Sequence, residues 1–323
     1  MNIYFLIIIF LINFFALSGS IAWSIFKLDY EPVITCAILT CSFIVSSKEL
    51  HKHIKIFRKT INLPVTLMGF VNSGKSVYLA VLFDELQKSN QLDYYIFPYG
   101  ADTIKKILKD TSTLNSGTWL SRTCRGEDFY YQAFITSKNK LLNKKYLLEM
   151  GDFSGEIFRY FNQENNDIGT STWLHDESFF EYVLHSKGIF FAVDLEFFIT
   201  KNKSDFYSNF NLDDILNMFI ATIHIIAEKK GVDNNYKIEI PICILFLKSD
   251  LIETNKINKD YIVNLSERLL KVCENRCRFF AHFFISSVGT TEEIYNQEHI
   301  PKTPLKPINV TEPIIWLLDR VKI

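Results

Sequence analysis

The stretch Pro64–Gln87, PVTLMGFVNSGKSVYLAVLFDELQ, joins an apolar run to a helix-like run through a short loop that contains glycine. The run Pro64–Gly69 has the length and composition of a buried strand. The run Lys75–Gln91 is typical of a helix. A strand, a glycine loop and a helix in this order begin a βαβ unit, so the stretch predicts an α/β fold around a mainly parallel sheet.

The loop itself, Gly69 to Ser76, reads GFVNSGKS and has two glycines five positions apart, followed by lysine and serine. This spacing matches the P-loop pattern, in which backbone N–H groups at a helix N-terminus point at phosphate oxygens. Lys75 supplies a cation for the phosphates, and the Ser76 hydroxyl is a ligand for Mg²⁺. An ordinary glycine turn is the alternative. The predicted nucleotide contacts in this loop are Gly69, Asn72, Ser73, Gly74, Lys75, Ser76 and Val77.

Composition bounds the remaining possibilities. The chain has 323 residues, of which 48% are hydrophobic, and its 35 Lys and Arg nearly balance 36 Asp and Glu. This length allows one large or two small domains. A net charge of −1 gives no global reason to expect a nucleic-acid partner, whose binding site would be a basic face. The six scattered cysteines form no disulfide framework and favour a reducing compartment.

Strand-like and helix-like runs alternate along the body of the chain, as in βαβ units. The strand candidates are Pro64–Gly69, Phe129–Thr136, Tyr146–Gly151, Gly188–Asp194, Ile238–Leu247 and Phe279–Ser286. The helix candidates are Lys75–Gln91, Thr103–Leu114, Leu212–Lys230, Asp260–Arg276 and Glu312–Lys322. The segment Thr290–Val310 contains three prolines and predicts an extended surface crossing.

The N-terminus predicts a membrane anchor. The run Asn2–Phe26 has no charged residue and is long enough to cross a bilayer as a helix. A cleaved signal peptide is less favoured, because no positive residue precedes the run and the run is too long. A second apolar run, Pro32–Ser47, is short for a full crossing, so a partly re-entrant helix and a single crossing by the first run are the alternatives. We expect a helical hairpin over residues 1–47, with helices at about 3–26 and 32–47.

The basic linker 48–61 follows this anchor. Its sequence from Lys48 to Lys59, KELHKHIKIFRK, has five Lys or Arg residues against Glu49. Such an excess beside a membrane span marks the cytoplasmic side. We therefore expect the protein at the cytoplasmic membrane, in contact with the lipid bilayer through its N-terminus, with a domain of residues 62–323 facing the cytoplasm.

Three later motifs follow the P-loop in a fixed order. The apolar run that ends at Asp152 continues as Phe-Ser-Gly and resembles the Asp-x-x-Gly motif of GTPases. There the aspartate holds Mg²⁺ and the glycine, here Gly155, senses the γ-phosphate. In many Ras-like proteins a glutamine then orients the attacking water. This chain has Glu156 instead.

The other two motifs concern the base. Ile242–Asp250 ends in Lys248-Ser249-Asp250, which looks like the Lys-x-Asp core of guanine recognition. The usual Asn or Thr of that motif is replaced by Leu247, which leaves an adenine nucleotide as an alternative. A further strand runs into a loop similar to the last GTPase loop, and its expected nucleotide contacts are Ser286, Ser287 and Val288.

The resemblance also implies a switch threonine between the P-loop helix and Asp152. Thr123 is the choice, with Thr118 and a plain loop threonine as alternatives. The expected metal ligands are then Ser76, Thr123 and Asp152. The expected catalytic residues are Lys75, Thr123, Asp152, Gly155 and Glu156.

In this order the motifs resemble the translation-factor-related (TRAFAC), Ras-like class of P-loop GTPases, and most of all the bacterial double-GTPase (DO-GTPase) group linked to defence systems. The resemblance implies a Ras-like, mostly parallel sheet with helices on both faces and one antiparallel edge, enlarged by insertions near 92–125 and 157–187. It implies GTP and Mg²⁺ as cofactors. A protein effector or a second GTPase would be the partner, because only one such domain is present.

The resulting hypothesis is a membrane-anchored GTPase that hydrolyses GTP slowly and acts as a nucleotide-dependent switch. The carboxylate of Glu156 beside the γ-phosphate requires compensation, for which Arg122, Arg125 and Arg159 are candidates. The alternatives are a P-loop ATPase and a nucleotide-binding scaffold without turnover.

The anchor gives a first prediction. The full chain should sediment with membranes and resist extraction at alkaline pH, because a helix of about 20 apolar residues partitions into the bilayer. Deletion of residues 1–47 should release the protein into the supernatant. Release of the full chain by alkaline carbonate would contradict the anchor.

Overall fold

A computed structural model describes residues 60–88, 94–124, 128–138, 145–155, 177–199, 212–232, 236–293 and 299–321, together with positions 8, 11, 12, 14–16, 18, 44 and 48. The chain forms two compact units, one of Met1–Ile61 with Asn139–Lys145 and one of Asn62–Lys138 with Tyr146–Ile323. The predicted membrane helices, 3–26 and 32–47, fall almost wholly outside the described residues. Among the residues that are described, none belongs to a helix with the length and apolar character of a membrane span.

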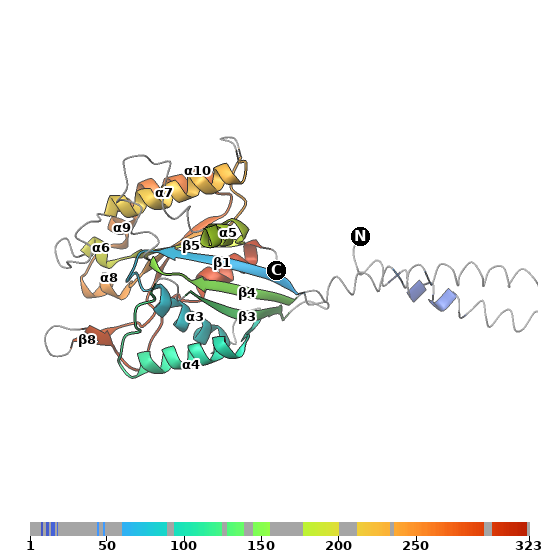
Figure 1. The fold of residues 1–323 in the computed structure, drawn as a ribbon, viewed down its shortest axis with the longest axis horizontal. Coiled ribbons are helices and arrows are strands. Elements are labelled where there is room, and N and C mark those ends of the chain that lie inside the picture. The colour runs from blue at the N-terminus through green and yellow to red at the C-terminus, as the bar shows by residue number, and fades with distance from the viewer. Residues whose placement is uncertain are drawn as a thin grey trace, which may run out of the picture. The chain divides into compact units, whose positions relative to one another are not determined.

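The second unit is built on a seven-stranded sheet, with the order β2-β3-β4-β1-β5-β6-β7 (Figure 1). The strands are β1 (Ile61–Gly69), β2 (Tyr94–Pro98), β3 (Phe129–Ser137), β4 (Lys145–Asp152), β5 (Gly188–Asp194), β6 (Ile242–Leu247) and β7 (Phe280–Ile285). Strands β1, β5, β6 and β7 pair in parallel, whereas β2 pairs with β3 in antiparallel orientation. The architecture is therefore α/β with a mixed sheet.

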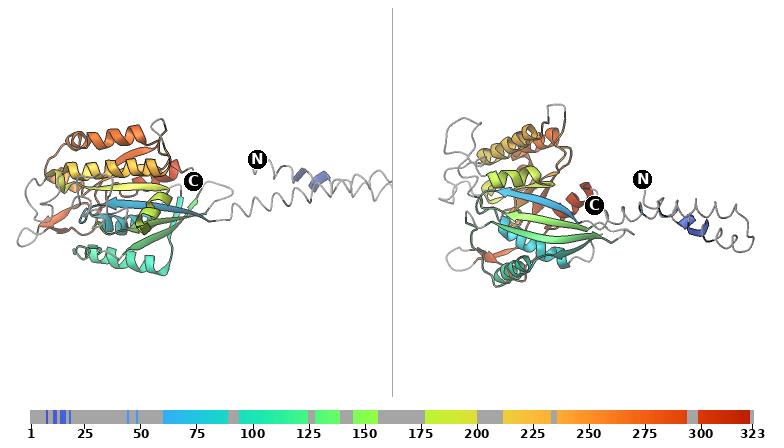
Figure 2. Two further views of the ribbon diagram at one scale, coloured as in Figure 1. Left: turned by 45° about the horizontal axis from the view of Figure 1, so that its top comes forward. Right: turned by 45° about the vertical axis from the view of Figure 1, so that its right-hand side comes forward.

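Helices cover both faces of this sheet. They are α3 (Lys75–Lys88), α4 (Ala101–Asn115), α5 (Glu177–His185), α6 (Glu196–Ile199), α7 (Leu212–Lys229), α8 (Asp250–Thr254), α9 (Lys259–Leu265), α10 (Glu267–Arg276) and α11 (Glu312–Arg320). Helices α3 and α4 lie on one side and α7 and α10 on the other, and the turned views in Figure 2 keep this arrangement. The sheet is thus the middle of three layers.

The central strands have the composition that this position requires. Strand β5, GIFFAVD, and strand β6, ICILFL, are buried at every residue. Parallel strands covered on both faces have near-continuous apolar runs of this kind. The two hydrophobic clusters that result join β5 and β6 to α7 and α10 on one face, and β1 to α3, α4 and α11 on the other.

The structure adds elements to the sequence prediction. Strand β2 was not among the strand candidates and forms one edge of the sheet. The segment predicted to be extended, Thr290–Val310, contains a two-stranded antiparallel ribbon of β8 (Thr291–Glu293) and β9 (His299–Pro301). Neither β8 nor β9 exceeds three residues, a length at which a sequence pattern gives little periodic signal.

Two predicted boundaries were wrong. Strand β6 begins at Ile242 rather than Ile238, which makes only an isolated bridge. Pro241 precedes β6 and has no N–H to donate to a neighbouring strand. The predicted helix Asp260–Arg276 is two helices, which meet at Ser266.

The core gives a second prediction. Phe191 is fully buried in β5, and its ring centroid lies 4.6 Å from that of Phe219 in α7. Phe191→Ala should cost about 3 to 5 kcal/mol through lost burial and a residual cavity. The corresponding fall in melting temperature, roughly 10 °C, is measurable by intrinsic fluorescence of the full chain in detergent micelles.

The matched control is Tyr236→Ala, since Tyr236 is 70% exposed. That variant should melt within about 2 °C of the wild type. Equal melting temperatures for all three proteins would mean that this cluster does not support the fold.

Candidate functional site

The loop between β1 and α3 has a backbone that few side chains permit. Asn72 and Gly74 have φ values of 62° and 88°. The Ser73 hydroxyl donates a hydrogen bond of 2.8 Å to the carbonyl of Phe70 and closes the turn. Left-handed residues close together in a loop turn successive N–H groups into a concave anion site. The loop therefore has the form expected of a phosphate-binding loop.

Lys75 is buried at the start of α3 and points back into this loop. Its Nζ donates hydrogen bonds of 2.8 Å to the carbonyls of Gly69 and Phe70. Burial lowers the pKa of Lys75 from 10.5 to about 8, although the carboxylate of Asp152 acts in the opposite direction. A phosphate bound in this loop would stabilise the ammonium group, because its negative charge offsets the loss of hydration that burial causes.

Three oxygen-bearing side chains from distant parts of the chain converge next to Lys75. The Ser76 Oγ lies 2.9 Å from Thr123 Oγ1 and 3.0 Å from Asp152 Oδ1. Thr123 Oγ1 lies 3.3 Å from Asp152 Oδ2. We call Ser76, Thr123 and Asp152 the oxygen cluster. These are the three residues that the sequence nominated as metal ligands, and the fold brings them together from α3, the loop after α4 and the end of β4.

The charge of the oxygen cluster resides on Asp152, which is 1% exposed. Burial raises the pKa of Asp152, opposed by Lys75, by the hydroxyls of Ser76 and Thr123 and by Lys106. A buried carboxylate of this kind is stabilised by a cation. Within the described part of the chain no group of three His, Cys, Asp or Glu residues forms a conventional metal cage. A single carboxylate with two hydroxyls suits Mg²⁺, which keeps waters and takes phosphate oxygens as further ligands.

Gly155 lies against the backbone of the phosphate-binding loop. A Cβ built on Gly155 would lie 2.2 Å from the Val71 nitrogen and 2.4 Å from the Phe70 carbonyl carbon. Only glycine fits this position, so the segment after Asp152 can approach the loop closely. Glu156, the next residue and a predicted catalytic group, lies outside the described residues, as do Arg125 and Arg159.

The segment that carries Thr123 also holds the alternative threonine and an arginine. Thr118 is exposed and its hydroxyl accepts a long hydrogen bond, 3.4 Å, from Ser116, away from the oxygen cluster. Arg122 is exposed and adjoins Thr123 in the sequence. Of the two threonines, only Thr123 meets Ser76 and Asp152.

The same segment is attached to the β8–β9 ribbon. The Trp119 Nε1 donates a hydrogen bond of 2.7 Å to the carbonyl of His299 in β9. A Cβ on Gly117 would lie 3.4 Å from Ile300 Cδ1. The loop with Thr123 is thus held by the ribbon that follows the last predicted nucleotide loop.

At the end of β6 and β7 the predicted base-recognition residues meet. The Ser286 hydroxyl donates a hydrogen bond of 2.6 Å to Asp250 Oδ1 and accepts one of 3.0 Å from the Gly289 N–H. One oxygen of Asp250 is fixed in this way. Burial raises the pKa of Asp250, while the Ser286 hydrogen bond lowers it.

Lys248, the second predicted base residue, has partners that sequence reasoning missed. Its Nζ donates hydrogen bonds of 2.6 Å to Asp194 Oδ2 and 2.9 Å to Glu196 Oε2. The signal in the sequence was the aspartate that ends the apolar run GIFFAVD, one strand away from Lys248 in the sheet. Leu247 is buried and faces the phosphate-binding loop, since a Cβ on Gly74 would lie 3.9 Å from its Cδ1.

The remaining predicted contacts line the same end of the sheet. Asn72 is exposed, Val77 and Ser287 are half-buried, and Val288 is buried. The Val288 carbonyl accepts a hydrogen bond of 3.0 Å from the Lys306 N–H, which fixes this loop against the segment before α11. The carboxyl ends of β1, β4, β5, β6 and β7 thus carry the phosphate-binding loop, the oxygen cluster and the residues around Lys248 and Asp250.

No protein-family model and no curated relative matches the chain. Among solved structures, the small GTPase Arl6 (BBS3) of Trypanosoma brucei with bound GppNp has 11% identity and a TM-score of 0.36, over 81% of this chain and 98% of that one. The GTPase-like domain of Ski7 from S. cerevisiae has 17% identity and a TM-score of 0.41 with GDP and phosphate, and 16% and 0.39 with GTP. These two matches extend over 83% and 85% of this chain but over only about half of the Ski7 chains, 51% and 53%. Identities and TM-scores this low carry no conclusion about the activity of the chain.

The buried ammonium gives a third prediction. The folded pKa of Lys75 is about 8, against 10.5 in an unfolded chain, so the unfolded chain binds more protons between these pH values. The cost of burying the charge is therefore fully present below pH 8 and is relieved as the pH rises toward 10. The melting temperature of the ligand-free wild type should rise relative to that of Lys75→Met between pH 8 and 9.5.

Lys302→Met is the matched control, because Lys302 is an exposed lysine outside the site. The difference between wild type and Lys302→Met should stay level over the same range. A wild-type melting temperature that falls relative to Lys75→Met would show that Lys75 is not a buried cation.

Proposed function

We propose that the protein is a Mg²⁺-dependent GTP hydrolase that works as a nucleotide-dependent switch. The observation that supports this proposal best is the oxygen cluster, because Ser76, Thr123 and Asp152 come from three separate segments and meet within hydrogen-bonding distance beside Lys75. A structural role alone gives little reason to bury a carboxylate next to two hydroxyls and a lysine at the mouth of an anion loop.

The residues present fit a magnesium ion. Ser76, Thr123 and Asp152 would hold it, and the ion would neutralise charge on the phosphate oxygens of the nucleotide. The chain contributes the hard oxygen donors that Mg²⁺ prefers, and the buried carboxylate provides the charge that attracts it.

The phosphates would lie in the loop between β1 and α3. In this proposal the N–H groups of that loop bind phosphate oxygens, and Lys75 exchanges its bonds to the carbonyls of Gly69 and Phe70 for bonds to the β- and γ-phosphates. Phosphoryl transfer depends on positioning and charge neutralisation more than on covalent chemistry. Gly155 and Thr123 would lie beside the γ-phosphate. The segments that carry them would therefore be ordered with GTP bound and released when hydrolysis removes this phosphate.

The base would lie between Lys248 and Asp250. A carboxylate fixed on one oxygen by Ser286 has its second oxygen available for the N1–H or N2–H groups of guanine, which adenine lacks. The apolar Leu247 is the one observation that favours a second candidate, an ATP hydrolase, because it removes a polar group from the usual guanine motif.

The proposal includes attachment to the cytoplasmic membrane through residues 1–47, with a slow intrinsic rate that a protein partner accelerates. The support is the uncharged N-terminal run followed by basic residues. Bacterial defence, in contrast, is proposed only on the family resemblance of the motifs.

The fourth prediction tests turnover. With GTP and Mg²⁺, the purified full chain should release phosphate slowly, and Lys75→Ala should reduce release at least about 100-fold by removing transition-state charge stabilisation. Thr123→Ala should reduce release about tenfold or more and raise the Mg²⁺ concentration required for half-maximal rate.

Thr118→Ala is the matched control, because it removes a threonine hydroxyl five residues away in the same segment and should keep the wild-type rate. Phosphate release faster from ATP than from GTP would favour the second candidate. Binding without any release by the wild type would favour the scaffold. Equal rates for Thr118→Ala and Thr123→Ala would remove Thr123 from the site.

A further inference from the structure

The ammonium of Lys248 is held between two carboxylates. Its Nζ lies 2.6 Å from Asp194 Oδ2 and 2.9 Å from Glu196 Oε2. The Asp194 side chain is 0% exposed, whereas Glu196 is 43% exposed. We call Asp194 and Glu196 the carboxylate clamp. It reaches Lys248 from β5 and α6, one strand away from β6.

The buried half of the clamp is fixed at both of its oxygens. Asp194 Oδ2 binds Lys248, and Asp194 Oδ1 accepts a hydrogen bond of 2.9 Å from the Glu196 N–H. Burial raises the pKa of Asp194, and Lys248 opposes this effect. Burial also acts against the charge on Lys248, but the two carboxylates outweigh it and raise the pKa of Lys248. Lys248 and Asp194 therefore form a partly buried ion pair in which the charge of each residue depends on the other.

The backbone of Lys248 explains why such a contact is required. Lys248 has a φ of 63°, in the left-handed region that residues other than glycine seldom adopt. A residue persists in this region when the surrounding contacts determine its conformation. The clamp provides such a contact at the far end of the side chain.

The neighbouring Leu247 cannot serve the same purpose. Leu247 is 2% exposed and its side chain has no polar atom to bind the phosphate-binding loop. It makes only an apolar approach toward Gly74, where an added Cβ would lie 3.9 Å away. Backbone hydrogen bonds attach the segment Leu247–Asp250 to Leu195 and Ile285. Its side-chain hydrogen bonds come from Lys248 to the carboxylate clamp and from Ser286 to Asp250.

We propose that Asp194 and Glu196 are positioning residues that determine base specificity, by holding the Lys248 stem as one wall of the base site beside Asp250. This inference rests on the proposed function, since it concerns the base of the same nucleotide. With its ammonium engaged by the clamp, Lys248 presents its methylene groups rather than a free charge to the base. Asp250 then supplies the hydrogen-bond acceptor that distinguishes guanine from adenine.

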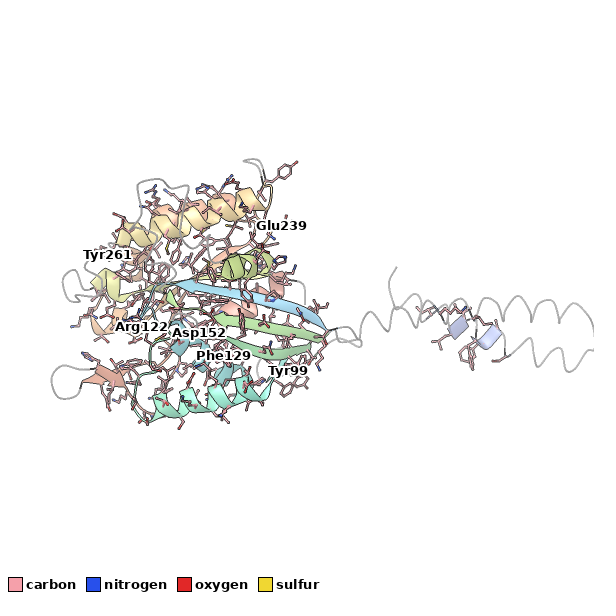
Figure 3. All side chains as sticks on the ribbon, viewed as in Figure 1. Tyr99, Arg122, Phe129, Asp152, Glu239 and Tyr261 are labelled. Atoms are coloured by element: carbon pink, nitrogen blue, oxygen red, sulfur yellow. The ribbon has the colours of Figure 1, made fainter. Side chains whose placement is uncertain are left out.

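The test measures nucleotide affinity of the full-length protein in detergent micelles. A fluorescent GDP analogue is titrated into each protein and displaced with GDP or with ADP, at fixed Mg²⁺. The variants are Asp194→Asn, Glu196→Gln, Lys248→Met and the double variant Asp194→Asn/Lys248→Met. Glu239→Gln is the matched control, since Glu239 is an exposed carboxylate paired with Arg278 before β6, at the other end of the sheet (Figure 3).

Asp194→Asn and Lys248→Met should each weaken GDP binding about tenfold or more, with ADP binding changed less than about twofold, so that discrimination falls. The double variant should be no weaker than Lys248→Met alone, because Asp194 acts through Lys248. Glu196→Gln, at the exposed half of the clamp, should weaken GDP binding only about two- to threefold. Glu239→Gln should bind as the wild type does.

Unchanged discrimination in Asp194→Asn, or additive losses in the double variant, would overturn the inference. Should Asp194→Asn fail to fold, Glu196→Gln combined with Lys248→Met decides by the same criterion of additivity. Failure of the proposed function is visible already in the wild type, as absent binding or a preference for ADP. Failure of the inference about the carboxylate clamp would appear only in the variants, with wild-type binding and preference for GDP unchanged.

Discussion

The attraction between two buried charges, those of Asp152 and Lys75, is the interaction on which the candidate site depends. The carboxylate of Asp152 and the ammonium of Lys75 are both nearly inaccessible to water, and each makes the other's burial less costly. This attraction requires β4 to lie beside β1 with its carboxyl end at the phosphate-binding loop, which the strand order provides. It also requires the chain after Asp152 to pass the loop at backbone distance, and Gly155 permits that passage.

The two halves of the candidate site are held by different parts of the sheet. The loop and the oxygen cluster depend on β1, β4 and the segment after α4, whereas the base-recognition residues depend on β5, β6 and β7. The apolar side chain of Leu247 makes no hydrogen bond to the phosphate-binding loop, so it provides no polar link between the halves. The carboxylate clamp instead ties Lys248 of the base half to β5 and α6. The two halves of the proposed nucleotide site, one for the phosphates and one for the base, therefore rest on separate sets of contacts.

Much of the fold followed from periodicity. The strands β1, β4, β5 and β7 and the helices α3, α4, α7 and α11 lie within a few residues of the predicted runs, because apolar runs between polar turns carry their own signal. Strand β2 and the β8–β9 ribbon were missed, since short edge elements depend on neighbours far away in sequence. Thr123 was expected beside Ser76 and Asp152 from the family resemblance, and no local pattern marks it. The clamp was missed because Lys248 and Asp194 are 54 positions apart and become neighbours only through strand pairing.

The hydrogen bond from Trp119 to His299 has a consequence for distances along the chain. Thr123 is four residues from this indole, and the ribbon begins two residues after Gly289, whose N–H contacts the hydroxyl that binds Asp250. The segment that carries Thr123 is therefore connected, through Trp119 and the β8–β9 ribbon, to the loop that contains Gly289, without passing through the seven-stranded sheet. Because Trp119 is exposed at this junction, its indole fluorescence is a natural reporter of the contact between the segment that carries Thr123 and the ribbon.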